Sequence, residues 1–126
     1  MTKDTFSSLF NQVFDMVCDH YGYSKHHDSH PYIEMEDSEC CDSEVDPSLM
    51  GEYCSVNNVL TLYWKNIHTI ENLIRTVVHE YQHYLQSPSW MTRYYNMGYN
   101  YNNHPYEIAA YSEEDTWKNF NKILTV

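Results

Sequence analysis

The chain has 126 residues, with 7 Lys and Arg against 18 Asp and Glu, which gives a formal net charge of −11, and 42% of it is apolar. This length predicts one domain, residues 1–126, whose core is large enough not to need disulfide staples. Nucleic-acid binding is not expected, because phosphate recognition needs clustered Lys and Arg. A membrane-spanning segment is not expected either, because the apolar runs are only a few residues long.

The four cysteines do not indicate a disulfide framework, because Cys40 and Cys41 are adjacent and no C-x-x-C spacing occurs. No signal-peptide apolar core follows Met1, so we expect free thiols and a cytoplasmic protein. The abundance of Tyr and Asn is compatible with a phage or viral genome, in which case the compartment is the host cytoplasm.

The first predicted element is an N-terminal helix. Apolar residues from Phe6 to Val17 follow the i, i+3, i+4 spacing of one helical stripe, and Gly22 ends the pattern. Residues 24–47 are rich in His and acidic side chains, which predicts an acidic loop region with one short strand, Tyr32 to Met35.

Two segments of alternating polarity come next, Met50 to Val56 and Val59 to Trp64. Asn57-Asn58 between them suits a tight hairpin turn, because Asn tolerates positive φ. We therefore expect a small antiparallel sheet of two or three strands. Its buried face should carry the larger apolar side chains of the second strand: Leu60, Leu62 and Trp64.

A second helix is predicted from Ile70 to Leu85. Thr69 is a good N-cap, and the apolar residues of this segment cluster on one face. Ser87-Pro88 ends it.

The remaining segment is predicted to be helical in two places. Residues 89–103 are rich in aromatic side chains and Asn, with a short helix expected around Trp90 to Tyr95. Pro105, which is favoured at a first helical position, opens a single final helix. Its apolar residues are Ile108, Ala109, Trp117, Phe120, Ile123 and Leu124.

The second helix contains the motif H-E-x-x-H, as His79-Glu80-Tyr81-Gln82-His83. On a helix the two histidines lie about 40° apart and opposite the apolar stripe, so both imidazoles can reach one metal ion. Glu80 lies one position further round, where it can approach a metal-bound water without being a ligand. The alternative is two ordinary surface histidines on an amphipathic helix.

A catalytic zinc site typically takes three protein ligands, and two residues are candidates for the third. Glu107 lies at the start of the final helix, and Ala109 and Ala110 are small enough to let that helix approach the histidines closely. His104 is the other candidate, although a cap or surface role suits it equally well. The longer pattern H-E-x-x-H-x-x-G-x-x-H is excluded, because Gln86 and Ser89 replace its Gly and third His.

From Met50 to Tyr111 the sequence resembles the gluzincin branch of zinc metallopeptidases, especially its very small members. The motif around His79 and the segment that begins at Pro105 carry this resemblance. It implies an α+β, zincin-like minimal domain in which zinc is held by His79, His83 and Glu107. It also implies that Glu80 is the general base for a zinc-bound water.

Two further features follow from the resemblance. A strand before the motif helix should border the cleft and pair with an extended peptide or protein substrate, which points to Gly51-Glu52-Tyr53 or to Val59 to Trp64. Some gluzincins carry an acidic residue four positions after the ligand Glu, where this chain has Tyr111. Tyr111 could orient a ligand, donate to an oxyanion or simply pack, and these alternatives stay open.

A second group, His26, His27, Asp28 and His30, has metal-binding side chains but no apolar periodicity to support a helix. We interpret it as a solvated loop. A more speculative hypothesis is that the acidic segment with Cys40 and Cys41 covers the cleft in a latent state.

The sequence thus predicts a zinc-dependent peptidase-like hydrolase with Glu80 as general base. The alternatives are a zinc-scaffold binding or regulatory protein without turnover, and a purely structural protein without metal. The net charge favours cationic peptides as cleft ligands.

Overall fold

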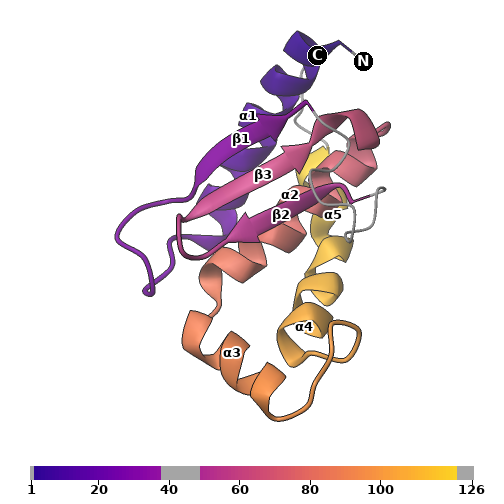
Figure 1. The fold of residues 1–126 in the computed structure, drawn as a ribbon. Coiled ribbons are helices and arrows are strands. Elements are labelled where there is room, and N and C mark those ends of the chain that lie inside the picture. The colour runs from indigo at the N-terminus through magenta and orange to yellow at the C-terminus, as the bar shows by residue number, and fades with distance from the viewer. Residues whose placement is uncertain (1, 38–48, 122–126) are drawn as a thin grey trace.

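Three strands form one sheet in the computed structural model, which describes residues 2–37 and 49–121. The strands are β1 (Tyr32–Glu36), β2 (Gly51–Cys54) and β3 (Val59–Tyr63), in the order β1-β3-β2. Helices α1 (Lys3–Tyr21) and α2 (Ile70–Leu85) lie behind the sheet in Figure 1. The predicted small α+β domain is confirmed at this level.

The remaining elements follow α2. A one-turn 3-10 helix, Trp64–Asn66, joins β3 to it. Helix α3 (Pro88–Asn96) stands apart from the sheet in Figure 1, and α4 (Pro105–Glu113) leads back toward α2. A 3-10 turn, Glu114–Thr116, then precedes the short helix α5 (Trp117–Asn121).

The sheet is mixed, so the prediction of an antiparallel sheet was wrong for one pair. β2 and β3 are antiparallel, with Gly51 opposite Leu62, but β1 runs parallel to β3, with Ile33 opposite Leu60. Alternating polarity and a hairpin turn specify only the β2–β3 pair. The connection between β1 and β2 is long enough for β3 of the hairpin to pair with β1. No short-range pattern in the sequence predicts this pairing.

The hairpin turn is longer than predicted. It spans residues 55–58, so β2 ends at Cys54 and does not reach Val56. Asn58 has a φ of 54°, which confirms the use of positive φ by an Asn in this turn. The predicted strand at Tyr32 is also confirmed and extends to Glu36.

The core lies between the sheet and the two long helices. All six apolar residues of the predicted first stripe are buried in α1: Phe6, Leu9, Phe10, Val13, Phe14 and Val17. Leu60 and Leu62 of β3 are fully buried, as predicted, whereas Trp64 lies in the 3-10 helix and is only partly buried. Thr69 caps α2 by accepting a hydrogen bond from the backbone N–H of Asn72 at 3.1 Å. The apolar residues of α2, among them Leu73, Val77 and Tyr81, pack in the core, and this orients the opposite face of the helix.

The predicted single C-terminal helix is interrupted. Thr116 donates its hydroxyl hydrogen to the carbonyl of Glu113 at 2.8 Å, and the Tyr21 hydroxyl donates to the Glu113 carboxylate at 2.8 Å. These bonds hold a 3-10 turn, which rotates α5 so that Phe120 enters the core. Of the apolar residues in the predicted final helix, Ile108 and Ala109 are exposed, whereas residues 123 and 124 lie outside the described residues.

Within residues 2–37 and 49–121, every helix is too short or too polar to cross a membrane.

Gly51 lies where β2 crosses α2 and where a side chain has no room. A Cβ atom there would lie 2.7 Å from Cγ2 of Thr76 and 3.1 Å from the backbone oxygen of Thr61. Thr76 cannot easily move away, because its hydroxyl donates to the carbonyl of Asn72 at 2.6 Å. We expect Gly51→Ala to lower the free energy of unfolding by about 1–3 kcal/mol, measured by urea denaturation.

Thr76→Ser is the matched second change, because it removes Cγ2 and keeps the hydroxyl. Added to Gly51→Ala, it should recover part of the lost stability. A double variant no more stable than Gly51→Ala alone would contradict this steric explanation.

Candidate metal centre

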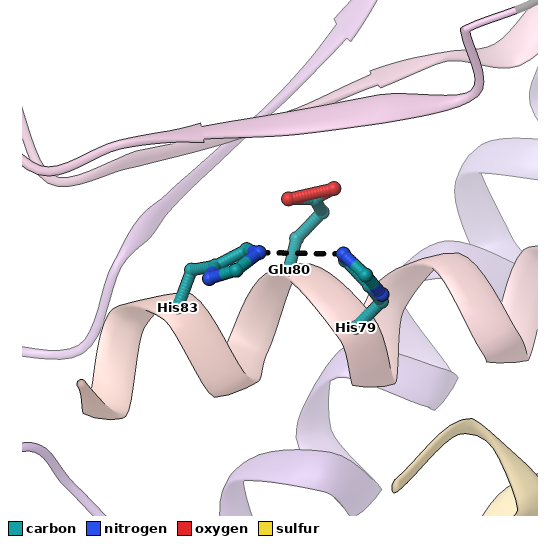
Figure 2. Close-up of side chains that lie close together, drawn as sticks. All are labelled: His79, Glu80 and His83. Carbon is teal, nitrogen blue, oxygen red and sulfur yellow. Dashed lines mark hydrogen bonds between the residues drawn. The ribbon is translucent and has the colours of Figure 1, made fainter. Parts of the chain in front are cut away.

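Two imidazoles face each other one turn apart on α2 (Figure 2). The Nε2 atoms of His79 and His83 lie 3.3 Å apart, and the ring planes meet at 75°. His79 is only 7% exposed. The alternative of two ordinary surface histidines is therefore wrong.

Hydrogen bonds on the far side of each ring fix the two tautomers. His79 donates from Nδ1 to the carboxylate of Glu114 at 2.8 Å. His83 donates from Nδ1 to Oε1 of Gln86 at 2.7 Å, because the Gln86 amide NH₂ is used to donate to the carbonyl of Tyr106 at 3.0 Å. In their neutral forms both rings consequently direct an Nε2 lone pair into the same space.

Glu107 brings a carboxylate to these lone pairs from α4. Its Oε1 contacts Nε2 of His83, and its Oε2 lies 3.5 Å from Nε2 of His79. The Oε2 atom is buried and has no hydrogen-bond partner. Two lone pairs and an anionic oxygen that converge in this way require a cation or protons between them, so the donor set fits a divalent metal ion.

The pKa values of His79, His83 and Glu107 are shifted in the directions expected for two cationic rings beside one anionic carboxylate. Burial alone would lower the pKa of His79, but the neighbouring carboxylates of Glu107 and Glu114 outweigh it and raise the pKa to about 10. The pKa of His83 is also raised, against burial, by its hydrogen bond to Glu107. Burial would raise the pKa of Glu107, yet the two histidines hold it far below its usual range. These shifts favour protonated imidazoles beside an ionised Glu107 carboxylate.

Glu80 lies beside this centre and, like Glu107, lines the same cleft. Its side chain rises from the helix toward the strands drawn above it in Figure 2. Glu80 is only 8% exposed, and a carboxylate oxygen of this residue and the two imidazole nitrogens all lie within 4.8 Å of one another. Burial raises the pKa of Glu80 to about 7, although His79 and His83 oppose this. His79, Glu80 and His83 together could hold a metal ion.

His104, the other candidate for a third ligand, has a different role. It is fully buried and caps α4, because its Nδ1 accepts a hydrogen bond from the backbone N–H of Tyr106 at 3.1 Å. Its Nε2 donates to the carbonyl of Met91 at 3.0 Å. Both ring nitrogens are thus used in joining α3 to α4. The small Ala110 is fully buried, as the preference for Glu107 required, whereas Ala109 is exposed.

The two residues that orient the imidazoles were not predicted from the sequence. Four residues after Glu107, the position considered there, the Tyr111 ring stands edge-on to His79 at 4.6 Å. The carboxylate that bonds His79 is Glu114, seven residues after Glu107 and hence two turns further along the same side. An i, i+7 search would have found Glu114. Gln86 had no comparable signal.

The histidines of the N-terminal loop do not assemble into a second site. His27 forms a hydrogen bond with the Tyr53 hydroxyl at 3.1 Å, and Nδ1 of His30 contacts the carbonyl of Pro31 at 3.0 Å. In the part of the chain that the structure describes, the single group suited to a metal ion is the one on α2. Cys40 and Cys41 lie outside the described residues, so the hypothesis of a latent state stays untested.

The centre opens into a cleft of about 710 Å³ between β2 and α3. The wall on the sheet side includes residues 49–53, and the wall on the other side includes Pro88, Met91 and Tyr95 of α3. Tyr101 and Tyr111 also line the cleft. Among the described strands β2 is at the edge of the sheet, so it can pair with an extended chain on the side away from β3, whereas β3 is paired on both sides.

Comparisons with protein-family models, curated proteins and solved structures give no match to this chain.

Metal binding is expected to release protons at neutral pH. A raised histidine pKa means that the metal-free centre is protonated below that pKa, and a metal ion must displace those protons. Apparent affinity for Zn²⁺ should therefore rise with pH until the pH passes the pKa of His79, about 10. Calorimetric titration in buffers of different ionisation enthalpy measures the number of protons released.

The control is Glu114→Gln, which removes one of the groups that raise the pKa of His79. This variant should release fewer protons than the wild type. Zinc binding without any proton release would contradict the assigned protonation.

Proposed function

We propose that this protein is a zinc-dependent peptidase-like hydrolase in which His79, His83 and Glu107 hold the metal and Glu80 is the general base. The convergence of two imidazole nitrogens and one buried carboxylate on one small space supports this most directly. Two imidazoles and one carboxylate are a donor set that suits Zn²⁺ and leaves a fourth position for water or substrate.

When bound, zinc supplies Lewis-acid chemistry, because it polarises a carbonyl group and lowers the pKa of water. Glu114 and Gln86 keep both imidazoles in the tautomer that offers Nε2. Outer hydrogen bonds of this kind also raise ligand basicity and fix the ring orientation.

Glu80 is the group that moves the proton. It is held beside the imidazole nitrogens on the same helix, and its carboxylate is almost fully shielded from solvent. A buried carboxylate with a pKa close to neutral is suited to accept a proton from an attacking water. It can then return that proton to the leaving amine, which completes hydrolysis of an amide bond.

The position of β2 favours an extended peptide as substrate. A peptide that pairs with the open edge of β2 enters the cleft along the wall nearest Glu80. Of the two alternatives from the sequence, Gly51-Glu52-Tyr53 belongs to the edge strand of the described sheet, whereas Val59 to Trp64 covers its central strand. Hydrogen bonds between backbones do not depend on the side chains of the peptide. This pairing would therefore contribute to affinity and would not select a particular sequence.

The deciding experiment combines metal analysis with a peptide assay. Purified protein is dialysed, its zinc content is measured, and it is incubated with a diverse peptide pool before and after chelation. We expect one tightly held zinc per chain and cleavage that stops on chelation and returns with Zn²⁺. Stoichiometric zinc without cleavage would favour a binding or regulatory scaffold, and absence of zinc binding would refute both.

A further inference from the structure

The cleft around the candidate metal centre is acidic. Glu52, Glu80 and Glu107 line it, and none of the described residues that line it is Lys or Arg. Of these carboxylates, Glu80 and Glu107 face the metal position, where the two charges of a zinc ion offset theirs. The charge of Glu52 is not offset in this way, so this carboxylate can interact with a substrate.

Glu52 belongs to the edge strand and lies on the opposite face of the sheet from the core. Its neighbour Gly51 is buried against α2, so alternation along β2 places Glu52 on the other face. The Tyr63 hydroxyl donates to its Oε1 at 2.8 Å and holds the side chain in place. Glu52 is exposed, and none of the ion pairs found among the described residues includes it.

A peptide paired with the open edge of β2 would bring one side chain directly beside Glu52. Residues opposite each other on neighbouring strands project from the same face and lie about 5 Å apart at Cβ. The side chains before and after that residue project from the other face, toward the metal position. The residue opposite Glu52 is thus adjacent in sequence to residues that face His79 and His83.

We propose that Glu52 selects substrates with Arg or Lys at the position that pairs with it on β2. This inference rests on the proposed function and names the class of peptide that the cleft accepts. The carboxylate, oriented by Tyr63, forms an ion pair with the basic side chain across the strands. The negative charge of the cleft adds attraction during encounter.

Binding and cleavage of matched peptides test this proposal. The probes are ten-residue peptides based on Ala and Val, with Arg or its neutral isostere citrulline placed at each position in turn. Zinc-loaded wild type is expected to prefer Arg at one position by about fivefold, in affinity and in cleavage rate, and to lose that preference as salt increases. Glu52→Gln should remove the preference, and Glu52→Lys should reverse it.

Glu34→Gln is the matched control. Glu34 and Glu52 flank Thr61 of β3 on either side, so both lie on the same face of the sheet, but Glu34 does not line the cleft. The control removes the same charge and should keep the preference for Arg.

Three results distinguish this proposal from the proposed function. Cleavage with equal use of Arg and citrulline, or with a preference that Glu52→Gln retains, would overturn the role of Glu52 and leave the hydrolase proposal intact. Cleavage with a preference that depends on Glu52 supports both. If no peptide is cleaved, the hydrolase proposal fails, and the affinity measurements alone decide whether Glu52 recognises a basic side chain.

Discussion

Glu80→Gln is expected to lower the rate of peptide hydrolysis by about 10²- to 10⁴-fold, the usual contribution of a general base. The amide has nearly the same shape as the carboxylate but cannot accept the proton of an attacking water. His79, His83 and Glu107 remain in place, so zinc binding should be retained. The measurements are the cleavage rate of a susceptible peptide and the zinc content of the same sample.

A change on the same helix gives the control. Glu71→Gln removes an exposed carboxylate from the first turn of α2, where it pairs with Arg75 at 3.3 Å, and should leave both zinc content and rate unchanged. If Glu80→Gln hydrolyses peptides at the wild-type rate, Glu80 is not the base. If it loses zinc, Glu80 belongs among the ligands and the assignment of Glu107 is wrong.

Short-range patterns in the sequence predicted the elements that pack through a single face. The six apolar residues of α1 recur every three or four positions, and all six are buried. The same reasoning placed Thr69 as the cap of α2 and put His79 and His83 on one side of it. Each of these predictions depends on residues within a few turns of one another, which is the range over which periodicity carries information.

The parts that the sequence did not predict depend on contacts between distant segments. The parallel pairing of β1 with β3 joins residues 32–36 to residues 59–63 through a connection whose path no local pattern specifies. The interruption after α4 depends on Tyr21, which is more than ninety residues away and holds Glu113 and Thr116. Helix propensity along residues 105–121 gives no information about a contact with Tyr21.

The centre itself shows the same division. The spacing of His79 and His83 was sufficient to predict two facing imidazoles, because one helix carries both. The approach of Glu107 was predicted from the resemblance of the sequence to gluzincins and from the small side chain of Ala110. In the structure, the Glu107 carboxylate lies against both imidazole rings, and Ala110 is buried. Glu114 was not predicted; it lies seven residues after Glu107 and bonds His79 from the 3-10 turn beyond the end of α4.

Glu107→Gln is expected to weaken zinc binding by more than about 100-fold, which exceeds the usual loss when only an outer partner of a ligand is removed. The neutral amide cannot balance the charge of the ion, and only two imidazoles remain as strong ligands. Zinc affinity is measured by competition with a chelator of known strength. The rise in melting temperature on addition of zinc should disappear in the same variant, because stabilisation by a ligand scales with its affinity.

Metal-free Glu107→Gln should also be less stable than the metal-free wild type at neutral pH. The histidines lower the pKa of Glu107 in the folded state, so its carboxylate stabilises the fold above its unfolded pKa, and that contribution is lost as pH falls. Circular dichroism must therefore confirm that the variant is folded under the conditions of the zinc titration.

His104→Asn separates loss of a ligand from general damage to α4. Asn can still cap the helix, but it is too short to keep the hydrogen bond to the carbonyl of Met91, so this variant should melt at a lower temperature. Its affinity for zinc should stay within about tenfold of the wild-type value, since His104 makes no contact with the centre and affects it only by helping to position α4. If His104→Asn loses zinc while Glu107→Gln retains it, the third ligand is His104, and α4 approaches α2 differently when the metal is bound.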